Sequence, residues 1–168
     1  MKVLMMMTSI ILFAQSNDSK SDWRIVDDVV MGGESQGMVK FSEEGNLVFH
    51  GKVSLENNGG FSSVRKRFEK VAITTQKKVK VKLKGDGKSY QFRLKADASQ
   101  EFAYIHIFET TGKWQEIEWS LDEMYPQFRG RKLRMPNFNE PQLEEIGFLI
   151  ANKKNEQFKL EIASIELF

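Results

Sequence analysis

The run Lys77–Lys84 reads KKVKVKLK, so that its valines and leucine share one face of an extended strand and its lysines share the other. A Gly-Asp-Gly turn follows at residues 85–87, where glycine tolerates the positive φ of a tight turn. The next run, SYQFRLK at residues 89–95, repeats the alternation. The pattern predicts two half-buried strands joined as a β-hairpin. Their apolar positions are Val79, Val81, Leu83, Tyr90, Phe92 and Leu94.

Similar alternation recurs along most of the chain. Further strands are expected at residues 47–55, 103–108, 116–121, 148–151 and 158–168. Roughly eight or nine short strands, with turn signals about every 8–12 residues, are typical of an antiparallel sandwich or barrel. One short helix is expected at Pro141–Glu145, with Asn139 as its N-cap. The sequence therefore predicts an all-β fold with helix confined to short turns.

Length and composition limit the chain to one domain of balanced charge. Its 168 residues fit a single domain of roughly 100–200 residues. The net charge of +2 is too small for a protein whose main partner is a nucleic acid. The chain has no cysteine, which excludes disulfides, thiolate metal sites and cysteine nucleophiles. No cofactor is expected. Whether the chain binds a metal is left open, since His50 and His106 are able to act as ligands but lack the paired spacing of a HExxH motif or a zinc finger.

The N-terminus has the features of an export signal. Met1–Ala14 carries one positive charge and then an apolar run, shorter than the about 20 residues that a transmembrane helix needs. We therefore expect a signal peptide over residues 1–14, a polar linker over 15–22 and one β-sandwich domain over 23–168. The mature chain would be periplasmic or extracellular, without a transmembrane span. The alternative is a cytoplasmic protein with a disordered tail.

Two patterns that resemble functional motifs have simpler interpretations. Residues 33–37, GESQG, spell the nucleophile elbow of a serine hydrolase, but a strand pattern follows where that motif needs a helix. We expect Ser35 to lie in a turn and not to act as a nucleophile, and no catalytic residue is predicted. A second pattern is a cationic face that is able to hold a phosphate or an acidic sugar; it comprises Lys80, Lys82, Lys84, Arg93 and Lys95. These cations are interpreted as solvent-facing residues that discourage edge-to-edge aggregation.

Two segments and one tryptophan are the candidates for a binding site. Residues 56–65, ENNGGFSSVR, suit a tight backbone that presents several hydrogen-bond donors. Residues 128–131, FRGR, set two guanidinium groups around a glycine, which suits bidentate recognition of a carboxylate or phosphate. By residue type, each segment fits a structural turn equally well. If the loops meet on one rim of a sandwich, the predicted patch comprises Asn57, Asn58, Gly59, Gly60, Arg65, Arg129, Arg131 and Trp114.

Several ordered motifs resemble those of one known family. They are WRIVDDVVMGG at residues 23–33, GKVSLENNGGFSSVR at 51–65, FET at 108–110, FRGR at 128–131 and IGFLI at 146–150. In this order they resemble the family of complex I intermediate-associated protein 30. The resemblance implies a galactose-binding-like jelly-roll β-sandwich. It also implies a chaperone-like role in assembling respiratory complex I.

Two functions of different classes follow. The first is a non-enzymatic assembly or chaperone-like domain that holds a protein partner, such as a subunit of a membrane complex, through its loop patch. The second is an exported carbohydrate-binding module, suggested by the sandwich class and by Trp114, whose ring suits stacking on a sugar.

Overall fold

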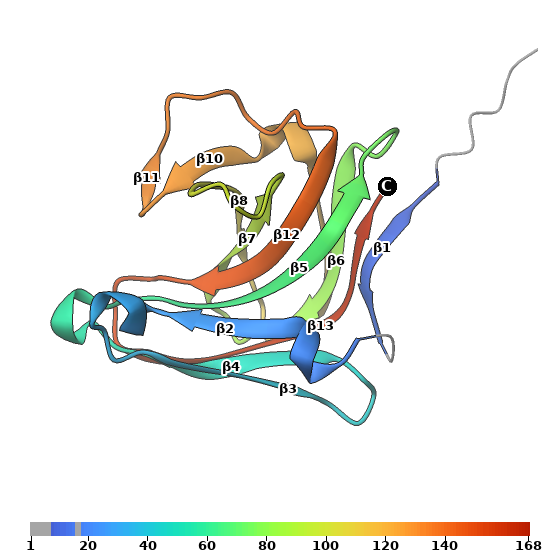
Figure 1. The fold of residues 1–168 in the computed structure, drawn as a ribbon. Helices are drawn as coiled ribbons and strands as arrows, with labels where there is room; N and C mark the ends of the chain where they lie inside the picture. Colours follow the sequence, from blue (N-terminus) through green and yellow to red (C-terminus); the bar gives the residue numbers. More distant parts are fainter. Residues whose placement is uncertain (1–7, 16–17) are drawn as a thin grey trace, which may run out of the picture.

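Two antiparallel sheets pack face to face in the computed structural model, which describes residues 8–15 and 18–168 (Figure 1). The six-stranded sheet has the order β3-β4-β13-β6-β9, with β1 also paired to β13. The seven-stranded sheet has the order β11-β10-β8-β7-β12-β5-β2. The predicted all-β jelly-roll sandwich is confirmed.

The strands of each sheet are as follows. The six-stranded sheet contains β1 (Ile10–Ala14), β3 (Gln36–Phe41), β4 (Leu47–Val53), β6 (Lys78–Lys84), β9 (Trp114–Ser120) and β13 (Glu156–Leu167). The seven-stranded sheet contains β2 (Trp23–Asp27), β5 (Ser62–Ala72), β7 (Ser89–Lys95), β8 (Ala103–Glu109), β10 (Tyr125–Phe128), β11 (Arg131–Lys132) and β12 (Gln142–Ile150).

Helix in the described residues is confined to short 3-10 turns, as predicted. They are η1 (Lys20–Asp22), η2 (Asp28–Met31), η3 (Glu56–Asn58) and η4 (Leu121–Glu123). The prediction of a helix at Pro141–Glu145 was wrong, because strand β12 begins at Gln142. The carbonyl of Pro141 accepts a hydrogen bond from the Ile73 amide, which continues the pairing of β12 with β5. Strand pairing thus overrides the local helix signal.

The strands of the quoted runs, β6 and β7, form as predicted but do not pair as a hairpin. Strand β6 pairs with β9 and β13, whereas β7 pairs with β8 and β12 in the other sheet. A hairpin would bring the lysines of β6 beside Arg93 and Lys95 of β7, and like charges on paired strands are destabilising. Instead, Lys80 lies opposite Glu118 and Glu166. The lysine face is therefore a solvated ladder of opposite charges.

The core lies between the apolar faces of the two sheets. Phe92 of β7 packs against Trp119 of β9 and Phe148 of β12, with ring centroids 5.0 and 5.4 Å apart. His106 stacks on Trp119 with ring centroids 4.4 Å apart, beside this core. Burial lowers the pKa of His106, although the charge of Glu123 opposes the shift.

The sandwich begins before Trp23, where the sequence places the start of the domain. Strand β1 pairs with residues 164–167 of β13, next to the stretch of β13 that β4 covers (Figure 1). Leu12 and Phe13 are 2% and 1% exposed in the core. An apolar run of this length fits both a signal peptide and a buried strand. Cleavage after Ala14 stays a prediction, and it would remove β1 from the sheet.

Replacing Phe13 with Ala tests how much β1 contributes to stability. Loss of a buried phenylalanine costs about 3–5 kcal/mol, and we expect urea unfolding of the full chain to show a loss of this size. The matched control is Ile11→Ala, because Ile11 lies on the same strand and is 54% exposed. The control should stay within about 0.5 kcal/mol of the wild type. Equal stabilities of the two variants would contradict the core position of β1.

Candidate functional site

One buried carboxylate joins two loops at one end of the sandwich, where η2 and η3 lie side by side (Figure 1). Asp28 is fully buried and accepts hydrogen bonds from the amides of Ser35 (2.9 Å), Gly60 (2.6 Å) and Phe61 (3.2 Å). Its fourth donor is the Ser35 hydroxyl at 2.5 Å. Burial raises the pKa of Asp28, but the hydrogen bonds from Ser35, Gly60 and Phe61 together bring it below its ordinary value. Asp28 therefore clamps the β2–β3 loop to the β4–β5 loop.

Ser35 belongs to this clamp and is fully buried. Its hydroxyl oxygen also accepts a hydrogen bond from the Ser54 amide at 2.9 Å. Strand β3 follows directly, so the GESQG segment lacks the helix of a nucleophile elbow. Ser35 thus has a structural position, away from any substrate in solvent.

The glycines of the two loops are required by close packing around Asp28. A Cβ on Gly33 would lie 2.4 Å from the Asp28 carboxylate, and one on Gly59 would lie 2.5 Å from it. The neighbouring Asp27 makes a similar link, accepting hydrogen bonds from the Gly37 amide at 2.8 Å and the Ser62 hydroxyl at 2.6 Å. The DDVVMGG and NNGG motifs therefore build one rigid loop pair.

The loop pair presents an exposed apolar tip. Val29, Val30 and Met31 are 61%, 75% and 57% exposed, and Leu55 of the other loop is also exposed. Asn57 beside them has a left-handed backbone (φ 54°). We call the exposed side chains of Val29, Val30, Met31 and Leu55 the apolar tip.

The predicted patch does not gather at one point. Asn57, Asn58, Gly59 and Gly60 lie in the loop pair, whereas Arg65 projects from β5 on the outer face of the seven-stranded sheet. Arg129 and Arg131 lie at the β10–β11 turn, at the opposite edge of that sheet from β2. Trp114 is half-exposed on β9, the edge strand of the other sheet.

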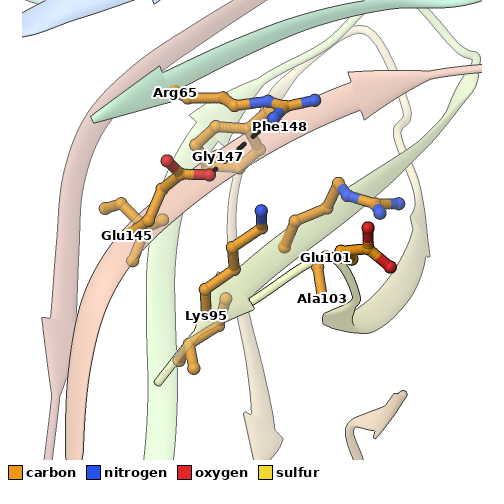
Figure 2. Close-up of a pocket in the computed structure, with 10 residues that line it drawn as sticks. Arg65, Lys95, Glu101, Ala103, Glu145, Gly147 and Phe148 are labelled. Atoms are coloured by element: carbon orange, nitrogen blue, oxygen red, sulfur yellow. Dashed lines mark ion pairs between the residues drawn. The ribbon is translucent and has the colours of Figure 1, made fainter. Parts of the chain in front are cut away.

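Arg65 instead belongs to a row of arginines that crosses the seven-stranded sheet. Arg24 of β2 is its register partner on one side, and Gly147 of β12 is its partner on the other. Gly147 is in turn the partner of Arg93 of β7. We call Arg24, Arg65 and Arg93 the arginine row. Arg65, Gly147 and Lys95 line one hollow on this face (Figure 2).

A single buried glutamate neutralises one side of the hollow. Glu145 accepts from Arg24 at 3.0 Å and from Arg67 at 3.1 Å, and it lies 3.9 Å from Arg65 (Figure 2 marks the Arg65 pair). Arg93 is held differently, since its Nη1 donates to the neutral amides of Gln91 at 2.7 Å and Gln127 at 3.2 Å. Burial, and next the charge of Arg65, lower the pKa of Arg93 to about 10.

Sequence reasoning placed Arg65 in the predicted patch and named Arg93 and Lys95 on an outer cationic face, but it missed Arg24 and Glu145 and did not bring these residues together. Each occupies an outward position of an alternating strand, a pattern that is ordinarily a solvated surface. Only the sheet order, which is set by distant pairing, brings them together. Among residues 8–15 and 18–168, no three carboxylate or histidine side chains cluster in a way that would hold a metal ion. No helix in the described part of the chain is long and apolar enough to cross a membrane.

The clamp motifs and the sandwich agree with a family match. The family model described as complex I intermediate-associated protein 30 (CIA30) matches residues 11–162. The chain belongs to the CIA30 family. A comparison with curated proteins gives no significant match.

The solved structures similar to this CIA30 domain include carbohydrate-binding modules. A family 11 module from Clostridium thermocellum, in complex with a β-1,3-1,4-mixed-linked tetrasaccharide, has 12% identity and a TM-score of 0.70, over 95% of each chain. The family 11 module of a cellulosomal cellulase from the same organism has 12% identity and a TM-score of 0.72, over 96% of this chain and 94% of that one. At this identity the likeness shows the shared sandwich fold.

Removing the Asp28 carboxylate should destabilise the CIA30 domain strongly. Asp28→Ala leaves the buried amide of Ser35 and the part-buried amides of Gly60 and Phe61 without their partner, at about 1–3 kcal/mol each. At about 2–4 °C per kcal/mol, we expect the melting temperature to fall by at least about 6 °C. Asp122→Ala, at an exposed position, should leave it nearly unchanged. Equal melting temperatures of Asp28→Ala and Asp122→Ala would contradict the role of Asp28 in holding the two loops together.

The same carboxylate makes this difference depend on pH. Because the pKa of Asp28 is lower in the folded protein, its contribution is complete above its unfolded value near 3.8. The contribution is lost as the pH falls below that value. The difference in melting temperature between the wild type and Asp28→Ala should therefore become smaller as the pH falls below about 3.8.

Proposed function

We propose that this protein is a non-enzymatic binding domain that docks onto a protein partner through its apolar tip. The observation that carries the proposal is the exposure of three consecutive apolar side chains, Val29, Val30 and Met31, on a loop pair fixed by a buried aspartate. Exposed apolar groups that are gathered in one place mark interaction sites.

The energetics favour docking at this tip. Full burial of a valine or methionine side chain contributes about 1.5–3 kcal/mol. Because hydrogen bonds to Asp28 hold the loop pair before binding, little further ordering entropy opposes association. The apolar tip is therefore preorganised to bind a partner that has an apolar pocket.

The CIA30 family name supports a protein partner, since it describes association with an intermediate of complex I. We propose an assembly or chaperone-like role in which the tip holds a subunit of a membrane complex. If the chain is exported, as its N-terminus predicts, the partner is a periplasmic or membrane-embedded protein.

Carbohydrate binding is the second candidate, favoured by the similarity to modules of family 11 over nearly the whole chain. Affinity electrophoresis in mixed-linked β-glucan tests it, with Trp114→Ala as the variant. Under the protein-docking proposal, we expect the glucan to retard neither the wild type nor this variant. Retardation of the wild type that Trp114→Ala abolishes would favour the carbohydrate function instead.

Site-specific crosslinking tests the docking proposal. A photoreactive benzoylphenylalanine at position 55, beside the tip, should give a defined protein adduct in the source cells, identified by mass spectrometry. In the same background, Val30→Ser with Met31→Ser should reduce the adduct at least about tenfold, since each lost apolar contact weakens binding by about that factor.

The matched control for this test is Met135→Ser, which changes a methionine that is 44% exposed outside the tip. The control should keep the adduct, and both variants should melt like the wild type because the altered side chains are exposed. An adduct of equal intensity in the double variant would overturn the proposal.

A further inference from the structure

The outer face of the seven-stranded sheet carries a concentrated excess of positive charge. Three cations, Arg65, Arg93 and Lys95, line the hollow together with two carboxylates, Glu101 and Glu145 (Figure 2). Arg24 and Arg67 lie next to the hollow and pair with Glu145, so the five cations outnumber the two carboxylates. The whole chain has a net charge of only +2. This excess is therefore a local feature of one face.

The central cations of this face are poorly solvated. The side chain of Arg65 is 24% exposed, and burial lowers the pKa of Arg65, of Arg93 and of Lys95. Neighbouring cations also lower each pKa: Arg24 and Arg67 act on Arg65, and Arg65 acts on both Arg93 and Lys95. Within the described residues, Arg93 has no carboxylate at ion-pair distance. An anion placed between Arg65 and Arg93 would offset both the loss of solvation and the repulsion between the cations.

The backbone between these two arginines leaves space for such an anion. Arg65 and Arg93 flank Gly147 on neighbouring strands, so their backbones are about 10 Å apart at the usual strand spacing. A Cβ on Gly147 would lie 2.6 Å from the Val64 carbonyl oxygen and 3.2 Å from Cγ of Arg65. The close Val64 carbonyl therefore requires glycine at position 147, and Arg65 and Arg93 line the same hollow on either side of it.

The guanidinium of Arg93 is also held in position. Hydrogen bonds from its Nη1 to Gln91 and Gln127 fix the planar group and leave Nε and Nη2 as further donors. A guanidinium presents paired donors that match the two oxygens of a carboxylate. The arrangement suits a carboxylate better than an uncharged hydroxyl group.

The next row on the same face indicates the source of the carboxylate. Register partners across it run Val26, Ser63, Leu149, Gln91 and Ile107. Ile107 is 49% exposed, so one exposed apolar side chain lies near the Arg93 end of the arginine row. Of the outward residues that the structure describes on this sheet, Tyr125 is the aromatic one, and Nζ of Lys132 lies over its ring at 5.0 Å. A sugar would find no open stacking platform here, whereas a peptide with acidic and apolar side chains fits both rows.

We propose that the arginine row binds an acidic polypeptide segment, one carboxylate of which lies between Arg65 and Arg93 while neighbouring apolar side chains contact Ile107. This site is separate from the apolar tip, and it gives the domain a second contact with charge specificity. The proposal does not depend on docking at the tip.

Fluorescence anisotropy with a labelled peptide built from Glu, Leu and Ser tests the proposal. The peptide should bind the full chain with an affinity that falls as salt rises. A matched peptide with Gln in place of Glu should bind at least about tenfold more weakly. Arg93→Gln should weaken binding of the acidic peptide about tenfold or more, by loss of a charge-assisted contact.

Controls distinguish this site from general charge attraction and from the tip. Arg131→Gln removes an exposed arginine at the far edge of the same sheet and should leave binding unchanged. Val30→Ser with Met31→Ser should also leave it unchanged, so that the two proposals fail separately. Thermal melting checks folding, which Arg93→Gln should preserve because the partners of Arg93 are neutral amides.

Three results would overturn the assignment. They are equal binding of the Glu and Gln peptides, equal loss of binding in Arg93→Gln and Arg131→Gln, and binding of polygalacturonate without binding of the acidic peptide. The last result would assign the arginine row to an acidic polysaccharide.

Discussion

The hydrogen bonds to the buried Asp28 carboxylate are the interaction on which the loop end of this sandwich depends. A carboxylate without exposure to water is stable only when strong donors replace that water, and four donors from two loops do so here. The conformation of each loop therefore depends on the hydrogen bonds that the other loop supplies. The glycines around Asp28 follow from the same constraint, since any side chain at Gly33 or Gly59 would occupy the space of the carboxylate.

This constraint changes how the family motifs are interpreted. The strings that make the chain recognisable as a CIA30 member, DDVVMGG and NNGG, are mainly the parts of the clamp. The exposed residues of the same strings, Val29, Val30 and Met31, are the ones proposed to meet a partner. The family motifs also contain Arg24 and Arg65, whereas Arg93 of the arginine row lies outside them. A family motif can thus contain both the scaffold of a site and its exposed residues.

The sequence predicts the strands well because period-two alternation is a local signal. Strands β6 and β7 illustrate this, since both match the quoted runs closely. Their separation into different sheets depends on glutamates in β9 and β13, far away along the chain. The arginine row is hidden for the same reason, because Arg24, Arg65 and Arg93 become neighbours only through the sheet order. Local alternation tells which face a residue occupies, but not which strand lies beside it.

The pairing of β1 with β13 has a consequence for synthesis. The first strand forms its hydrogen bonds with residues 164–167, so it has no partner in the sheet until β13 has left the ribosome. Throughout that interval the apolar run around Leu12 and Phe13 remains available to any factor that binds nascent chains. The time for which this run stays unpaired therefore depends on how soon β13 is synthesised.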